Sequence, residues 1–399
     1  MAGDSDERFI RHFLNPRNVT QNLENMKKFI LFILFVATIS EIHSQTPFIN
    51  KELQKGNFNV GFKRIWEIDK SRVWPRSSNI DSLEGNVNRP IRIDVWYPAQ
   101  KNGNDEMLFR EYVYPITGSQ KYEDINFLTK RWDIYSYKGL TEDSLKFEKL
   151  MNTKIPVFKN AEPIKKRFPL VIYSAGWYNR SPDNTILAEF LASHGFIVAT
   201  VPQLNPGLWT WNFASDFRSV ENQTRDLEFA IGKLIRESNV DRTKIAAIGY
   251  STGGDVALLL QGRNELIDCV VGMDASWSLG KDNDVVDSPF FNSEFNNVPI
   301  LVIRRKTDNK EYNEVLDSLN LSERFIIDIE GSNHGSFSDD PPQREMLGIT
   351  VTSSSKIHAM VTNIILDFLN HNFDKSTNSN FIKQVKRKGR ILSINIDKK

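Results

Sequence analysis

Residues 245–261 read Ile-Ala-Ala-Ile-Gly-Tyr-Ser-Thr-Gly-Gly-Asp-Val-Ala-Leu-Leu-Leu-Gln. An apolar run typical of a buried strand leads here into a glycine-rich turn and then into a helical run. The turn, Gly249-Tyr250-Ser251-Thr252-Gly253, carries the Gly-x-Ser-x-Gly pattern of a nucleophile elbow. Such an elbow holds its serine in strained backbone, and small residues on either side let strand and helix approach closely. The pattern predicts Ser251 as a nucleophile, with an ordinary glycine-rich turn as the alternative.

Strand and helix patterns alternate on both sides of this stretch. Predicted strands cover 169–174, 196–201, 244–250, 270–273, 299–304 and 324–329, and predicted helices cover 184–194, 217–236 and 356–373. This alternation favours an α/β fold with a mostly parallel central sheet and helices on both faces. Earlier in the chain, runs at 58–68 and 91–98 around a polar loop at 79–90 predict an antiparallel start to the sheet. A helix is predicted at 141–151, with Thr141 as its cap.

The two ends of the chain differ from this core in composition. Residues 1–25 are polar and are interpreted as an upstream extension, whereas 26–44 place lysines before an uncharged apolar run at 29–40 and a small residue at 44. That order predicts a signal peptide and export, either secretion or a periplasmic location. The apolar run is shorter than the roughly 20 residues of a membrane span, so an anchor formed by 29–40 is the alternative. We assign 45–373 to one α/β domain and 374–399 to a polar, then basic, solvated tail.

Charge and metal-ligand patterns exclude several classes of function. The 399 residues include 51 Lys and Arg and 50 Asp and Glu, so no nucleic-acid partner is expected. There is no His-x-x-x-His and no Cys/His cluster, so neither a metal nor another cofactor is implied. The single cysteine, Cys269, cannot form an intrachain disulfide and is expected to be a core thiol. The sequence does not determine an oligomeric state.

A serine nucleophile requires a base and an acid that orients the base. His334 follows the last predicted strand directly, and loops at the carboxyl ends of parallel strands are where α/β sheets carry their chemistry. His334 is therefore the expected general base. Two aspartates follow strands between the serine and the histidine, Asp274 and Asp308, and sequence order allows either to be the acid.

The elbow, the stretch Met273-Asp274-Ala275-Ser276-Trp277 and the stretch Gly331-Ser332-Asn333-His334 resemble motifs of the plasma-type platelet-activating factor acetylhydrolases. The resemblance covers roughly residues 58–373, with the motifs in the same order, and extends to dienelactone-hydrolase-like esterases of the α/β-hydrolase fold. It implies that fold and a serine esterase activity. It also implies that the acid is Asp274 and that Asp308 is the alternative.

An oxyanion hole is expected from the amide of Thr252, which follows the nucleophile, and from an amide in the loop 174–178. The resemblance implies that the second amide is that of Trp177. The family usually has His-Gly before this position, whereas this chain has Ala175-Gly176, which leaves the local hydrogen bonding open. Aromatic residues on loops predict an apolar acyl or ring pocket, with plain packing as the alternative: Tyr178, Trp209, Trp211, Trp277 and Phe290.

These residues predict an exported serine ester hydrolase with a small-molecule ester or lipid substrate. By resemblance, short-acyl esters or phospholipid-like lipids are the expected substrates, which would place the chain in lipid degradation. Carbohydrate esters, aryl esters and dipeptidyl-peptidase-like chemistry are alternatives, since the same three residues serve all of them. A non-catalytic binding protein of this fold would be expected to lack one of Ser251, His334 or the acid.

Overall fold

The computed structural model describes residues 46–75, 86–100, 105–113, 140–177, 183–203, 217–279, 285, 288–306, 314–349, 354–374, 381–387 and 391–397. The chain divides into two compact units, Met1–Thr46 and Pro47–Lys399. Only Thr46 of the first unit is described, so the fold below is that of the second unit. The predicted signal peptide at 26–44 lies outside the described residues.

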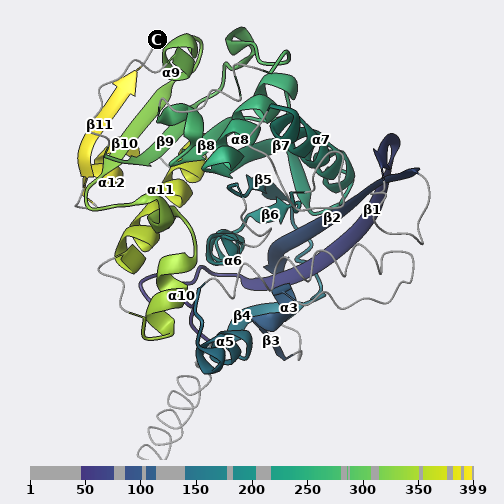
Figure 1. The fold of residues 1–399 in the computed structure, drawn as a ribbon, viewed down its shortest axis with the longest axis vertical. Helices are drawn as coiled ribbons and strands as arrows, with labels where there is room; N and C mark the ends of the chain where they lie inside the picture. The colour runs from purple at the N-terminus through teal and green to yellow at the C-terminus, as the bar shows by residue number, and fades with distance from the viewer. Residues whose placement is uncertain are drawn as a thin grey trace, which may run out of the picture. The chain divides into compact units, whose positions relative to one another are not determined.

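The second unit is built on one sheet, in which the described strands follow the order β11-β10-β9-β8-β7-β5-β6-β2-β1-β4-β3 (Figure 1). Six neighbouring strands, β10 to β6 in that order, are parallel. They are β5 (Phe168–Ser174), β6 (Ile197–Thr200), β7 (Val240–Tyr250), β8 (Cys269–Met273), β9 (Ile300–Arg305) and β10 (Arg324–Ile329). The predicted parallel core is therefore confirmed, with strand ends within a few residues of those expected.

The parallel strands are apolar on both faces because helices cover both. Alternate residues of β5 enter two different cores: Val171 and Tyr173 pack with α6 and α11, whereas Leu170 and Ile172 pack with α7 and α8. The first core is covered by α6 (Thr185–Ser193) and α11 (Ser354–Phe373). The second is covered by α7 (Phe217–Leu234), α8 (Thr252–Arg263) and α9 (Glu314–Ser318). This is the expected layering of helices on both faces.

A long antiparallel hairpin joins the parallel strands at β6. It consists of β1 (Asn59–Pro75) and β2 (Asn86–Ala99), and β2 pairs antiparallel with β6. β2 begins within the predicted loop 79–90, and Pro90 pairs with Ile68, so the loop is shorter than expected. Beyond β1 lie β4 (Lys154–Lys159) and β3 (Glu106–Leu108), with α3 (Arg110–Val113) between them in sequence. Neither strand was predicted.

The helix predicted at 141–151 begins later than expected and has a different cap. The helix predicted at 141–151 is α5 (Ser144–Met151), and its cap is Asp143, whose carboxylate accepts from the amides of Leu145 and Lys146. Thr141 instead accepts a hydrogen bond from the Asp143 amide. A carboxylate two to three residues before free helix amides is the stronger cap, because it is charged and close to the positive end of the helix dipole.

The C-terminal segment is not a solvated tail. α12 (Phe381–Lys386) buries Phe381 and Val385 in the core beneath α11, and β11 (Ile391–Asp397) pairs antiparallel with β10. Apolar residues four apart and an alternating Ile-rich run are present in this segment, although its lysines and arginines dominate the composition. The domain therefore extends past the predicted boundary at 373, to Asp397.

Candidate active site

The elbow between β7 and α8 has the backbone that its sequence predicts. Ser251 adopts φ 53° and ψ −126°, a strained conformation for a residue with a side chain. A Cβ added to Gly249 would lie 1.9 Å from the carbonyl oxygen of Gly253, and a Cβ added to Gly253 would lie 2.2 Å from the carbonyl oxygen of Ser174. Both glycines are thus required by the close approach of strand and helix. The turn presents Ser251 at the carboxyl end of the sheet.

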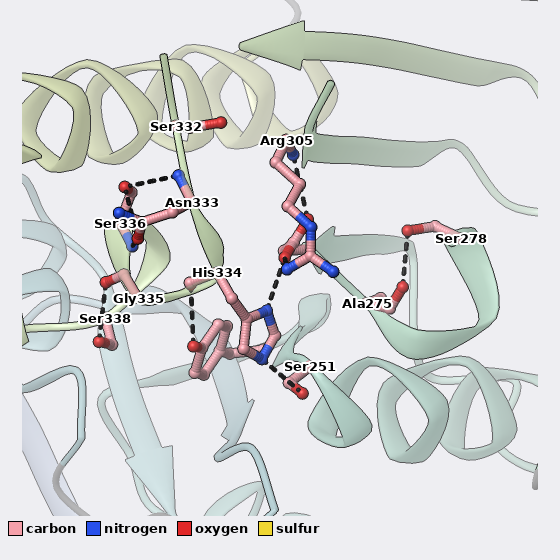
Figure 2. A network of polar contacts seen from close by, with 12 residues as sticks. Ser251, Ala275, Ser278, Arg305, Ser332, Asn333, His334, Gly335, Ser336 and Ser338 are labelled. Carbon is pink, nitrogen blue, oxygen red and sulfur yellow. Dashed lines mark hydrogen bonds and ion pairs between the residues drawn. The ribbon is translucent and has the colours of Figure 1, made fainter. Parts of the chain in front are cut away.

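His334 lies beside this serine, with Nε2 3.0 Å from Ser251 Oγ. It begins a short 3₁₀ helix, η4 (His334–Phe337), in the segment that follows β10. A capping box fixes the start of η4, because the Asn333 side chain accepts from the Ser336 amide and the Ser336 hydroxyl accepts from the Asn333 amide. Figure 2 shows the imidazole between Ser251 and Arg305.

Tyr250 supports the imidazole from the elbow itself. Its ring stacks on His334 with centroids 5.0 Å apart, and its hydroxyl donates to the His334 carbonyl oxygen at 2.9 Å. Burial, together with nearby carboxylates, raises the pKa of Tyr250, so the phenol stays protonated as a donor. The residue immediately before the serine therefore fixes both the ring plane and the backbone of His334.

The acid side of the site is formed by Asp274, which directly follows β8. Its Oδ2 lies 2.6 Å from His334 Nδ1, and the residue is fully buried. Its backbone has φ 44°, and its amide donates to the Ile303 carbonyl oxygen at 2.7 Å, which turns the carboxylate toward the histidine. The structure thus brings together Ser251, His334 and Asp274 as expected. Asp308 lies outside the described residues.

Arg305, the last residue of β9, also binds this carboxylate. Its amide donates to Asp274 Oδ1 at 3.0 Å, and its guanidinium Nη1 lies 2.8 Å from Oδ2. No sequence pattern singled out this arginine, because a basic residue at the end of a strand is typical of a solvated position. Only the neighbouring position of β8 and β9 in the sheet reveals the pairing.

The proposed oxyanion donors belong to the residue after the serine and to the loop after β5. Thr252 is the first residue of α8, where the amides are not used within the helix. The loop after β5 contacts the elbow at Gly253, and Trp177 follows two residues beyond Ala175. Gln203 donates to the Ala175 carbonyl oxygen at 2.7 Å, and the Gly176 amide donates to Asp183 at 3.4 Å. These two bonds, which sequence reasoning left open, hold the loop in place.

The aromatic pocket predicted from the sequence needs correction. Tyr178, Trp209 and Trp211 lie outside the described residues. Trp277 does not line an open pocket, because it is fully buried in the core and fills the space beside two glycines, Gly254 and Gly272. Phe290 is 48% exposed and lies over Arg263, at the far end of α8 from the serine. Twelve helical residues separate the two ends by about 18 Å, too far for a shared pocket.

Other expectations concern groups away from the serine. Cys269 is a free, buried thiol in the core, and burial raises its pKa. Among the described residues, no group of three or more His, Cys, Asp and Glu side chains is placed to hold a metal ion. In the same part of the chain, none of the helices combines the length and apolar character needed to cross a bilayer.

The parallel sheet, the strained serine turn and the histidine after the last parallel strand define an α/β-hydrolase fold. No protein-family model matches the chain. It is 24% identical over 314 residues to the platelet-activating factor acetylhydrolase of Cavia porcellus, a match that covers 65% of this chain and 66% of that protein. It is also 24% identical over 310 residues to the enzyme of the same name from Bos taurus, covering 63% and 64%. The matched region thus spans slightly less than two thirds of these curated relatives.

A solved structure with the same fold is a ferulic acid esterase from Streptomyces cinnamoneus. It superposes with a TM-score of 0.58 over 80% of this chain and 92% of its own, at 19% sequence identity. The fold predicted from the sequence and the resemblance to acetylhydrolases are therefore both confirmed.

Proposed function

We propose that the chain is a serine carboxylic-ester hydrolase in which Ser251, His334 and Asp274 form the catalytic triad. The observation that carries this proposal is the unbroken hydrogen-bonded series from Ser251 Oγ through His334 to the Asp274 carboxylate, at 3.0 and 2.6 Å. It starts from a serine held in strained backbone at the tip of the elbow. A surface serine near a histidine by chance would have neither the strained turn nor the buried third partner.

The reaction follows from this geometry. His334 Nε2 takes the Ser251 hydroxyl proton as Oγ attacks the ester carbonyl carbon, and the same nitrogen then returns the proton to the departing alkoxide. Asp274 keeps the second imidazole proton on Nδ1 and stabilises the imidazolium. The amides of Thr252 and Trp177 stabilise the oxyanion. Water, activated by His334, then hydrolyses the acyl-serine and restores the free hydroxyl.

Short-acyl esters, including phospholipid-like ones, are the substrates we propose first. This choice rests on the similarity to two proteins named platelet-activating factor acetylhydrolase. Aryl esters are the second candidate, favoured by the shared fold with a ferulic acid esterase. A panel of chromogenic esters of increasing acyl length, run beside an oxidised phospholipid and a feruloyl ester, separates the two.

The mechanism is tested by replacing the nucleophile. Ser251→Ala should lower kcat by about a million-fold while the protein remains folded, because loss of a triad serine removes covalent catalysis. Ser318→Ala is the matched control, since that hydroxyl donates to the Val315 carbonyl oxygen within α9 and is not part of the proposed triad. Activity retained in a folded Ser251→Ala protein would rule out the mechanism.

We further propose that the protein is exported, with residues 26–44 acting as the signal peptide. The support is the order of basic, apolar and small residues in that segment. N-terminal sequencing of the exported protein should give a start near Gln45. Recovery of intact residues 29–40 in membrane-bound protein would favour the anchor instead.

A further inference from the structure

The loop after β5 lies against the nucleophile elbow through one peptide unit, the one that joins Ala175 to Gly176. A Cβ added to Gly253, two residues after Ser251, would lie 2.5 Å from the Ala175 carbonyl oxygen. The N–H of this peptide unit belongs to Gly176, and the next N–H along the chain, that of Trp177, is the proposed second oxyanion donor. The orientation of this peptide unit therefore bears directly on the oxyanion hole.

Both polar groups of the 175–176 peptide unit are held by side chains from other segments. A trans peptide is planar, so its C=O and N–H point in opposite directions. On one side, Gln203 Nε2 donates to the Ala175 carbonyl oxygen at 2.7 Å. On the other side, the Gly176 N–H donates to Asp183 Oδ2 at 3.4 Å. Alanine and glycine side chains carry no hydrogen-bonding groups, so these bonds from outside the loop fix the peptide plane.

We propose that Gln203 is a positioning residue for the oxyanion hole, which directs the Trp177 amide by holding the peptide unit before it. The role deepens the proposed function and rests on it. The two dihedral angles of Gly176 connect the held peptide to the Trp177 N–H, and glycine is the residue whose angles are least restricted. Once the peptide unit is free to turn, these angles no longer fix the direction of the N–H. An oxyanion donor stabilises the transition state only when it is already directed at the developing charge.

The bond from Gln203 is the stronger of the two. Its 2.7 Å lies at the short end of N–H···O distances, whereas the 3.4 Å of the bond to Asp183 exceeds their usual range. Gln203 is buried and follows β6 by three residues, and β6 pairs with β5 up to Thr200 and Tyr173. The donor and the loop that it holds therefore leave neighbouring parallel strands at the same edge of the sheet.

The longer bond connects the peptide unit to the base side of the site. Asp183 Oδ1 accepts from the Tyr173 phenol at 2.7 Å, and Asn184 Nδ2 lies 2.6 Å from the same hydroxyl. Burial, together with Asp183, raises the pKa of Tyr173, so the phenol stays protonated as a donor. Asn184 also donates at 3.2 Å to the carbonyl oxygen of Phe337, the last residue of η4. Gln203 thus holds the peptide unit against a frame that includes the element of His334.

Gln261, in the last turn of α8, provides a matched control. It is also a buried glutamine whose Nε2 donates to a backbone carbonyl oxygen, that of Phe295 at 3.2 Å. It lies at the opposite end of α8 from Ser251. Gln261→Met should therefore lower the free energy of unfolding, as Gln203→Met does, without changing the catalytic steps.

The first test is steady-state hydrolysis of a chromogenic acetyl ester, with rates divided by the concentration of folded protein. Gln203→Met keeps the length of the side chain but cannot donate a hydrogen bond. It should lower kcat about ten- to a hundred-fold with KM unchanged to within about two-fold, since displacing an oxyanion donor costs less than removing one, which costs about a hundred- to a thousand-fold. Gln203→Leu replaces Gln203→Met if the latter does not fold.

The second test is inhibition by a trifluoromethyl ketone, to whose carbonyl carbon Ser251 Oγ adds. In this addition the serine proton passes to His334 Nε2, and the ketone oxygen becomes an oxyanion like that of the ester intermediate. The inhibition constant should rise in Gln203→Met by the same factor by which kcat/KM falls. An inhibition constant does not depend on how many molecules are folded, so a purely structural role would not change it. Gln261→Met should keep the wild-type value.

The outcomes distinguish this inference from the proposed function. A wild-type inhibition constant in folded Gln203→Met would overturn the positioning role, and so would a loss of kcat/KM no larger than that of Gln261→Met. Either result would leave the Ser251 mechanism intact, provided that wild-type hydrolysis is lost in Ser251→Ala. Absence of Ser251-dependent hydrolysis in the wild type would instead overturn the proposed function, and the positioning role with it.

Discussion

Replacing Asp274 by asparagine exchanges one carboxylate oxygen, a hydrogen-bond acceptor, for an NH₂ group, a donor. The carboxylate accepts from three donors: the Arg305 amide on Oδ1, and the Arg305 guanidinium and His334 Nδ1 on Oδ2. An asparagine amide has only one acceptor oxygen. With that oxygen in the Oδ1 position, its NH₂ group faces two donors, and His334 must turn Nδ1 into an acceptor by moving its proton to Nε2.

The expected loss of activity follows from this change of tautomer. A proton on Nε2 points at Ser251 Oγ, so the imidazole can no longer take the hydroxyl proton. In serine proteases the same substitution lowers kcat about ten-thousand-fold, which corresponds to roughly 5.5 kcal/mol of transition-state stabilisation. The free energy of unfolding should fall by only about 1–3 kcal/mol for the disrupted buried hydrogen bonds. Asp274→Asn is therefore expected to be folded and nearly inactive.

The assay compares Asp274→Asn with Asp308→Asn across the neutral pH range, with chemical denaturation of each variant run in parallel. Asp308→Asn should keep most of the wild-type kcat, because Asp274 already occupies the position beside His334. The reasoning is refuted if folded Asp274→Asn retains more than about a tenth of the wild-type kcat, a loss far smaller than that of a displaced triad acid. It is equally refuted if Asp308→Asn shows the larger loss.

The remaining predictions concern Tyr250, two glycines and the buried Glu189. Tyr250→Phe keeps the stacked ring but loses the hydrogen bond to the His334 carbonyl oxygen, so kcat should fall by about two- to ten-fold in steady-state assays. Gly253→Ala should lower the free energy of unfolding by about 3 kcal/mol or more, or prevent folding, because its Cβ overlaps backbone. A Cβ added to Gly232 in α7 would meet no neighbouring group within 4 Å. Gly232→Ala should therefore raise the free energy of unfolding by about 0.5–1 kcal/mol in the same denaturation assay. Burial raises the pKa of Glu189 from 4.5 to about 8. Between these pH values the folded protein holds a proton that the unfolded chain has lost, so the free energy of unfolding falls as pH rises through that window. Glu189→Gln should remove this pH dependence, which is on the order of a few kcal/mol, and an unchanged slope of unfolding free energy against pH would contradict the prediction.

The parts of the fold that could be predicted from the sequence are those with a local signal. An apolar run followed by Gly-x-Ser-x-Gly predicts a strand, a strained turn and a helix without any long-range information. His334 could be identified as the base from its position after the last predicted strand. The acid was ambiguous because Asp274 and Asp308 both follow strands. The residues alone do not distinguish the two aspartates, because the choice depends on how far each strand end lies from His334 in space.

Other features escaped because their cause is spatial. Arg305 is typical of an exposed residue until β8 and β9 are seen to be neighbours. Trp277 resembles a pocket aromatic in sequence, but two glycines without side chains leave a space that its indole fills. In the C-terminal segment the basic residues hid the apolar positions of α12, because composition averages over the few residues that are buried.

The sheet order also bears on how activity returns after denaturation. Ser251 and His334 are separated by 83 residues, and Asp274 and His334 by 60, so no single helix or hairpin contains the site. The contributing strand ends belong to β7, β8, β9 and β10, and β11 then pairs with β10 at the C-terminal end of the chain. Pairings between strands distant in sequence form slowly because the intervening chain must be ordered first. Recovery of esterase turnover should therefore lag behind recovery of helical circular dichroism. The length of this delay would measure how slowly the parallel sheet assembles.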